Sequence, residues 1–586
     1  MRRGSFRRIL WNDNFSSRCR LRKVGAGFLT LSRVDVVMVK LYTLHELDQT
    51  EGTVQLQQTS TDTKDAELIL FPRPSKIDPN DPLRWSQVQK HVCFFAVCSF
   101  TFFTNYAIGG LAPAFALLSK EFGKSMNETS DLLKWPVLVL GVFNFFWVPL
   151  ANYFGKRPVF VFASLLLCVA YIWGAFAQSF KSLLWSNIVA AFAGSTTEAL
   201  GAAIVNDLYF LHERSSKMSI YMASISGGNT VGPLICGFIA ETIGWRWHKG
   251  IAAIAVAINF LLVVFFVPET SYDRDGPGTL SPSLSTEKEI AKEDVLTATV
   301  SRKTAIRASQ PPMNLPEQIP KNTYRQSIKL FSAPRPQASL LHLFARPFPL
   351  SAYPAVIYAF LAYAVSLALT VAINILSSYV LSAAPYSFSP ALIGLVNVPG
   401  LLGNLVGAFV GGWCVDRYSA WRTKRAGGVF RPETRLPLLV VPALLVPVGC
   451  LLWGYGVERA WHWIALFWGY GLISVGLTAA TAPTMVYVSE CYFPVQIDAL
   501  LLVNGKPLLS HLSSVYVWML TAEPGFKNIV AFGFLYGVVP WVDNMGYIDC
   551  FGTQAGIYVA FLLLGVPLYF YGERIRHATA KWRIIL

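Results

Sequence analysis

Glu198 is the residue best placed to do chemistry in this chain of 586 residues, because it lies inside a long apolar stretch, 183–207. A carboxylate at the centre of a membrane helix costs about 2.5–3.5 kcal/mol unless it is paired or hydrated. Such a group can hold a proton or a cation and alternate between the two. The alternative is a carboxylate that only stabilises a structural partner.

Other polar side chains in apolar stretches could complete a binding site around Glu198. At about 100° per residue, one helical face carries Asn187, Gly194, Glu198, Gly201 and Val205, and we expect this face to line a cavity. Further candidates for the site are Asn105, Tyr106, Tyr363, Asn374, Asn397 and Asn404, with Glu490 as a candidate for an ion pair at a gate. A lone Asn or Tyr of this kind also suits a hydrogen bond between helices.

Carboxylates and aromatic rings without an evident Lys or Arg in the cavity favour a cationic or neutral amphipathic solute. No motif indicates catalysis: in the stretch before Gly123-Lys124-Ser125, Leu118 stands where a phosphate-binding loop needs its first glycine. The nine cysteines are scattered, and no His pair has the spacing of metal ligands. We therefore predict no enzyme activity, no metal and no cofactor, with energy drawn from a proton gradient.

The elements that must position these residues are membrane helices, since 53% of the residues are hydrophobic and only 14% are charged. About 20 largely uncharged residues cross a hydrocarbon core of about 30 Å. The sequence predicts about twelve such spans, of which the eleventh is broken: 91–118, 132–152, 158–177, 183–207, 216–240, 248–267, 350–380, 389–415, 435–455, 460–487, 497–541 and 553–572.

The net charge of +15 comes from Lys and Arg in alternate loops, which indicates membrane topology and argues against nucleic acid as a partner. The positive-inside rule places both termini in the cytoplasm, and we expect the plasma membrane, with the vacuolar membrane as the alternative. On the opposite side, Asn127-Glu128-Thr129 is a candidate glycosylation site, unless the match is a chance one.

Polar segments divide the chain into domains. The predicted parts are a flexible cytoplasmic region (1–85), a first helical bundle (86–267), a cytoplasmic linker (268–345), a second helical bundle (346–572) and a cytoplasmic tail (573–586).

Several motifs resemble those of the major facilitator superfamily: DPNDPLRW (78–85), NDLYFLHER (206–214), GWRW (244–247), VPET (267–270) and RPETRLP (431–437). Within it, the chain is similar to the fungal twelve-helix drug:proton antiporters, including the branch that carries histidinol and polyamines. The resemblance covers about residues 70–575.

This resemblance implies an all-α polytopic membrane protein in which two six-helix bundles surround a cavity at the midplane. It implies a monomer that moves a small organic solute, such as a drug, a toxin or a cationic metabolite, by alternating access with proton antiport. A proton-coupled importer of nutrients or polyamines and a non-transporting membrane sensor with the same fold are the alternatives.

The stretch GGNTVGPLICG (227–237) matches the antiporter motif of this family through Gly228, Gly232, Pro233 and Gly237. Cys236 replaces an expected glycine. Small residues let two membrane helices approach closely. Because Pro233 removes a backbone hydrogen bond, we expect a bend that seals one side of the pathway. A generic packing face is the alternative.

Two loops match the family motif that latches neighbouring helices in the outward-facing state. The residues of this motif are Asn152, Gly155, Lys156 and Arg157 in the first half, and Asp416 and Arg417 in the second. Asn152 replaces the expected Asp, which predicts a weaker latch in the first half. The family often has an Arg at the position of Asn187, so a proton relay that depends on this Arg is not expected here.

The segment 505–525, GKPLLSHLSSVYVWMLTAEPG, has no counterpart in the family. It would lengthen or break the eleventh span. Our hypothesis is a retained intron in the gene model, and a true insertion is the alternative.

Overall fold

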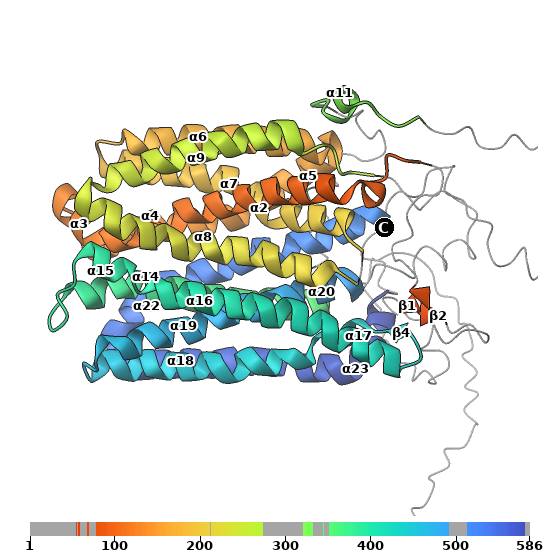
Figure 1. The fold of residues 1–586 in the computed structure, drawn as a ribbon. Coiled ribbons are helices and arrows are strands. Elements are labelled where there is room, and N and C mark those ends of the chain that lie inside the picture. Colours follow the sequence, from red (N-terminus) through yellow and green to blue (C-terminus); the bar gives the residue numbers. More distant parts are fainter. Residues whose placement is uncertain are drawn as a thin grey trace, which may run out of the picture. The chain divides into compact units, whose positions relative to one another are not determined.

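The chain folds into a bundle of helices (Figure 1). A computed structural model of the protein describes residues 54–55, 57–58, 67–68, 78–210, 212–272, 320–331, 344, 351–491 and 512–580. All of them belong to one compact unit, Tyr42–Leu586. Most of the expected linker, the tail beyond residue 580 and residues 505–511 of the unmatched segment lie outside the described residues.

The first half contains six spans. They are α2 (Gln87–Gly109), the pair α4 (Met126–Val142) and α5 (Asn144–Phe154), α6 (Lys156–Ala175), α7 (Phe180–Leu208), α8 (Arg214–Thr242) and α9 (Trp245–Phe266). Short helices flank the first span: η1 (Pro82–Arg84), η2 (Ala112–Ala114) and α3 (Phe115–Phe122).

The second half repeats this arrangement. Its helices are α14 (Pro354–Ser382), α15 (Pro390–Gly394), α16 (Asn397–Phe409), the π-helical η4 (Val410–Cys414), α17 (Val415–Arg425), η5 (Pro432–Arg435), η6 (Pro437–Leu439), α18 (Val440–Glu458), α19 (Trp463–Ala479), α20 (Thr481–Cys491), α22 (Leu512–Leu563) and α23 (Gly565–Ala580). A one-turn helix, α11 (Tyr324–Ser327), lies between the halves in sequence. Four two-residue strands form two antiparallel pairs, β1 (Val54–Gln55) with β4 (Val429–Phe430) and β2 (Gln57–Gln58) with β3 (Glu67–Leu68).

Nine stretches of the described chain are long and apolar enough to cross a membrane. The last of them, Gly525–Thr579, contains two arms, because Gly546 leaves the helical conformation with φ of 80°. The stretch Gly525–Thr579 therefore counts as two spans. The helices α2 and α8, of 23 and 29 residues, are also long enough to cross a membrane, which brings the total to twelve spans. The helix α22 runs without a break from residue 512 to Gly546, so the expected break does not fall within the described part of the unmatched segment.

The burial of the spans separates inner from outer helices. In α7 and α14, 82% and 83% of the most apolar window is buried, against 33% in α9. One stripe of α9 at helical spacing is exposed and suits contact with lipid: Ile251, Ile254, Ile258, Leu261 and Phe265. Glu198 lies on an inner helix and is therefore withdrawn from the lipid.

The two halves meet along two pairs of helices. In the first pair α8 packs against α15 and α16, and in the second α4 packs against α22. Figure 1 shows α8 beside α16, with α3 and α15 at one end of the bundle and α17 and α23 at the other. We call these the α15 end and the α17 end. The predicted topology makes the α17 end cytoplasmic.

Candidate functional site

Glu198 joins the two halves near the middle of the bundle. Its Oε1 accepts a hydrogen bond from Lys527 Nζ at 2.9 Å, and its Oε2 accepts one from Asn528 Nδ2 at 2.6 Å. Both partners come from α22, in the second half, whereas Asn144 Nδ2 of the first half lies 3.3 Å from Oε2. The side chains of Glu198 and Lys527 are 4% and 1% exposed. A buried ion pair thus connects the halves.

Lys527 is a buried cation beside Glu198 that the sequence analysis did not single out. Its ammonium also lies 3.8 Å from the centroid of the Tyr363 ring, on α14, so an aromatic face and a carboxylate enclose it. Lys527 does not itself line the cavity described below, whose lining among the described residues contains no Lys or Arg, but its ammonium pairs with the carboxylate that does. The signal was present, because Lys527 lies at the start of an apolar run, just as Glu198 interrupts one. It lies only two residues beyond the unmatched segment 505–525, however.

A small cavity lies beside this ion pair. Its apolar wall comes mainly from α4 and α14, and its polar lining residues are Asn105, Glu198, Asn229, Asn374 and Asn528. An apolar pocket with a few convergent polar groups is typical of a small-molecule site. The cavity thus includes three of the predicted site residues, Glu198, Asn105 and Asn374.

The predicted polar face of α7 does not line the cavity as a whole. A Cβ added at Gly194 would lie 2.0 Å from Thr104 Cγ2 on α2, and one added at Gly201 would lie 2.5 Å from Tyr221 Oη on α8. These glycines permit close packing inside the first half. Only Glu198 of this face reaches the cavity, so the expectation is wrong for the other four residues.

Three other candidates bond to neighbouring helices and lie outside the cavity lining. The Tyr106 hydroxyl lies 2.9 Å from His248 Nδ1, and the Asn397 side chain accepts a hydrogen bond from Tyr470 Oη at 3.3 Å. Asn404 Nδ2 donates across the halves to the Ser226 carbonyl at 3.5 Å. These three residues therefore form hydrogen bonds between helices, which was the alternative to a role in the binding site.

Asn187 contacts a buried cation that the sequence analysis did not single out. Lys249 Nζ, on α9, donates to Asn187 Oδ1 at 2.7 Å, and the ammonium lies 5.1 Å from the centroid of the Tyr171 ring. The first half therefore has a cation from a neighbouring helix beside Asn187, where the resembled family often has an Arg.

The stretch 227–237 is a packing surface with two partners. A Cβ added at Gly228 would lie 2.3 Å from the Phe102 carbonyl oxygen on α2. A Cβ added at Gly232 would lie 2.7 Å from the Tyr106 carbonyl oxygen, also on α2. One added at Gly237 would lie 2.4 Å from the Pro390 carbonyl oxygen on α15, in the second half. The helix continues through Pro233 to Thr242, and Cys236 is fully buried.

An exposed carboxylate joins the two halves at the α15 end, between the same two helices. Glu241, in the last turn of α8, accepts a hydrogen bond from the Ala391 backbone N–H at 3.0 Å through Oε2. Ala391 lies in the first turn of α15, where backbone N–H groups lack partners within the helix. A negative charge is favourable at this position.

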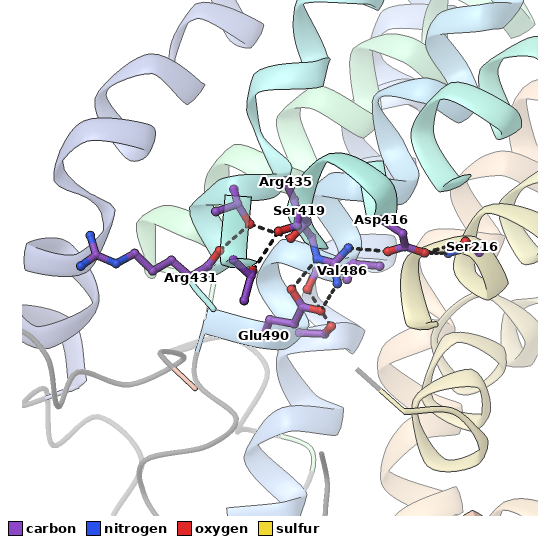
Figure 2. A network of polar contacts seen from close by, with 10 residues as sticks. Ser216, Asp416, Ser419, Arg431, Arg435, Val486 and Glu490 are labelled. Carbon is purple, nitrogen blue, oxygen red and sulfur yellow. Dashed lines mark hydrogen bonds and ion pairs between the residues drawn. The ribbon is translucent and has the colours of Figure 1, made fainter. Parts of the chain in front are cut away.

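A larger polar cluster closes the α17 end, and Figure 2 shows it. Asp416 Oδ2 accepts hydrogen bonds from the backbone N–H and the hydroxyl of Ser216, at 2.8 and 2.5 Å, in the first turn of α8. Its Oδ1 accepts one from Arg435 Nη1 at 2.8 Å. Arg435 also forms two bonds to Glu490, at 2.6 and 2.7 Å. We call Ser216, Asp416, Arg435 and Glu490 the latch cluster.

The latch cluster contains two of the predicted residues, Asp416 and Glu490. Glu490 forms an ion pair with Arg435, and its role at a gate stays a prediction. Arg417, the other motif residue of this loop, is exposed on α17, and the guanidinium beside Asp416 is that of Arg435.

In the first half, the corresponding loop is tied within its own half. The backbone N–H groups of Lys156 and Arg157 donate to the Glu269 carboxylate at 3.1 Å each, and Lys156 Nζ pairs with Asp207. Gly155 has φ of 100°, and a Cβ there would lie 2.4 Å from Glu269 Oε2, so the loop requires glycine. Asn152 Nδ2 is buried without a hydrogen-bond partner among the described residues.

Asn127 is exposed in the first turn of α4, and its Oδ1 accepts a hydrogen bond from Lys134 Nζ at 2.9 Å. The following Thr129 is buried. Glycosylation of Asn127 stays a prediction.

A bundle of twelve spans with a central polar cavity and polar closures at both ends defines a polytopic membrane protein of the solute-carrier class. The chain belongs to the Major Facilitator Superfamily, whose family model matches residues 95–492. Proteins of this superfamily carry small-molecule solutes across membranes and are not enzymes.

Three of the curated relatives are fungal proteins. An uncharacterized MFS-type transporter of Schizosaccharomyces pombe is 25% identical, covering 88% of this chain and 90% of its own length. Protein HOL1 of Saccharomyces cerevisiae is 23% identical, covering 88% and 91%. Efflux pump radE of Floropilus chiversii is also 23% identical, covering 90% and 88%. Among solved structures, the proton:xylose symporter XylE has a TM-score of 0.52 and 14% identity, covering 83% of this chain and 96% of its own, and it supports the fold alone.

Proposed function

We propose that this protein is a proton-coupled secondary transporter that exports a small organic cation by antiport, with Glu198 as the coupling carboxylate. The observation that carries the proposal is the buried ion pair of Glu198 and Lys527, which links the halves beside the cavity. A relative named an efflux pump agrees with export, and so does the resemblance to drug:proton antiporters.

The coupling follows from the cost of a buried charge. Removing one partner of a buried ion pair costs about 3–5 kcal/mol, because the other charge stays uncompensated. The halves can therefore separate beside Glu198 only when a proton or another cation neutralises this carboxylate. Because one carboxylate serves both ligands, the carrier exchanges one for the other, which is antiport.

Alternating access needs contacts that exist in one state and not in the other. The latch cluster supplies such contacts at the α17 end, and Glu241 supplies one at the α15 end. Opening at either end exposes the cavity to one side of the membrane. In this proposal the membrane is the plasma membrane, and both termini are cytoplasmic.

The test uses the full-length protein in liposomes with an imposed pH gradient. Uptake is measured for a panel of organic cations and neutral amphipathic solutes. We expect gradient-driven flux of a cation in the wild type and its loss in Glu198→Gln. Glu128→Gln is the matched control, because Glu128 is exposed and does not line the cavity.

Full gradient-driven flux in Glu198→Gln would contradict the coupling role. A gradient that drives the solute in the same direction as the protons would indicate an importer. No gradient-driven flux for any solute would instead favour a sensor with the transporter fold.

A further inference from the structure

The ammonium group of Lys527 occupies a site built for a cation. Its Nζ lies 2.9 Å from Glu198 Oε1 and 3.8 Å from the centroid of the Tyr363 ring. A carboxylate oxygen and the face of an aromatic ring are the groups that bind organic ammonium ions in proteins. We call Glu198 and Tyr363 the ammonium site.

The hydrogen bonds of Glu198 leave room for one cation. Oε2 is engaged by the amides of Asn528 and Asn144, at 2.6 and 3.3 Å, so these amides hold the carboxylate in place. Oε1 faces Lys527. Among the described residues that line the cavity, Glu198 is the only carboxylate, so a second ammonium ion would enter without a compensating charge.

We propose that Lys527 is a tethered stand-in for the solute, which fills the ammonium site in the empty carrier and leaves when the solute's ammonium enters. This inference rests on the proposed function. The solute class is an alkylammonium compound, whose charge would replace that of Lys527. Its apolar part would lie against Leu133, Val137 and Leu140 of α4 and Leu367 and Val371 of α14.

This exchange explains how a solute could loosen the contact between the halves. Lys527 belongs to the second half and Glu198 to the first, so their ion pair spans the interface. A free ammonium compound keeps Glu198 compensated but is attached to neither half. The flexible four-carbon stem of lysine lets the displaced ammonium move into the hydrated, open cavity.

The experiment measures the binding of n-butylammonium to the purified full-length protein in nanodiscs, with n-butanol as the uncharged isostere. The variants are Lys527→Met, which keeps the length of the side chain and removes its charge, and Lys527→Arg, which replaces it with a cation that binds carboxylates through two bonds. A tethered competitor acts at an effective concentration in the millimolar range or above. We therefore expect Lys527→Met to bind n-butylammonium at least about tenfold more tightly than the wild type.

Lys527→Arg is expected to bind n-butylammonium more weakly than the wild type, and n-butanol should not distinguish the variants. A residue with a merely structural role would weaken binding in both substitutions. Adding Glu198→Gln to Lys527→Met should abolish the gain. If Lys527→Met does not yield folded protein, Lys527→Gln takes its place.

Lys134→Met is the matched control. Lys134 is also a buried lysine, 3.1 Å from Asp131 Oδ1 and 5.6 Å from the centroid of the Tyr536 ring, but it does not line the cavity. Its substitution should leave the affinity for n-butylammonium unchanged.

Equal or weaker binding by Lys527→Met than by the wild type overturns the inference. If the wild type still exchanges a cation for protons in liposomes, the proposed function survives this result. Conversely, n-butylammonium could bind most tightly to Lys527→Met and most weakly to Lys527→Arg while no solute shows gradient-driven flux. That result would overturn the proposed function and leave the ammonium site in place.

Discussion

Asp416→Asn should open the α17 end of the bundle, because Asp416 accepts the hydrogen bonds that join the latch cluster to α8. Its carboxylate accepts two hydrogen bonds from Ser216, at 2.8 and 2.5 Å, and one from Arg435. Arg435 keeps its two bonds to Glu490 in the variant, so its charge stays compensated. With its oxygen toward Ser216, the asparagine turns its NH2 toward Arg435 and loses that bond, but Asp416 and Arg435 both belong to the second half. The ratio of closed to open states therefore depends on the contact with α8.

The size of the effect follows from the charge of the acceptor. A hydrogen bond to a charged group contributes about 1.5–3 kcal/mol, and one to a neutral group contributes about 0.5–1.5 kcal/mol. An asparagine oxygen can still accept from Ser216, so two bonds weakened by about 1 kcal/mol each give a loss of about 2 kcal/mol. Since 1.4 kcal/mol is a factor of ten, the ratio of closed to open states falls about thirtyfold. A carrier closed 99 to 1 would become closed about 3 to 1.

The assay is a distance measurement between spin labels at His212 and Lys424. Both residues are exposed; His212 lies just before α8, and Lys424 lies on α17. In Asp416→Asn we expect a second, longer distance that is nearly absent from the wild type. Arg417→Gln is the control, because Arg417 is the exposed neighbour that does not pair with Asp416. A distance distribution identical to that of the wild type, or the same change in Arg417→Gln, would refute the reasoning.

Gly232→Leu should abolish transport while the protein still inserts into the membrane, because the new Cβ would lie 2.7 Å from a carbonyl oxygen of α2. Gly533→Leu is the control, since a Cβ at Gly533 meets nothing within 4 Å. Normal flux in Gly232→Leu would contradict this. Glu241→Ala removes the acceptor of the Ala391 N–H and should loosen the α15 end, seen as faster labelling of a cysteine introduced there, whereas an unchanged rate argues against a closure. Sequencing of mature transcripts should show that the codons of 505–525 are removed, and a message that retains them would defeat the intron hypothesis.

The spans and Glu198 could be predicted because their signals are local. Apolar length marks a membrane helix within about twenty residues, and a single carboxylate in such a run is visible without any partner. Lys527 could not be assigned in this way, since it lies 329 positions from Glu198 and only the packing of α22 against the first half brings them together. Pairings across the two halves are fixed by tertiary contacts, which one sequence does not reveal.

Asp416 and Arg417 show that neighbouring residues of a motif need not pair with each other. Asp416 and Arg417 are neighbours in the motif, but adjacent residues on a helix point in different directions, and both lie on α17. Asp416 therefore faces α8 while Arg417 is exposed, and the partner of Asp416 comes from η5, after a loop. The motif therefore marks the carboxylate, whereas the cation that pairs with it lies outside the motif.

At each end of the bundle, α8 and the second half are joined by a hydrogen bond from a backbone N–H to a carboxylate, and the half that supplies the carboxylate differs between the two ends. At the α17 end, a carboxylate of the second half receives an N–H from the first turn of α8; at the α15 end, a carboxylate of α8 receives an N–H from the first turn of α15. Each closure joins a negative charge to the positive end of a helix dipole, which contributes about 0.3–2 kcal/mol in addition to the hydrogen bonds themselves. In the proposed mechanism, the exchange of a proton and a solute at Glu198 changes which of these two contacts persists.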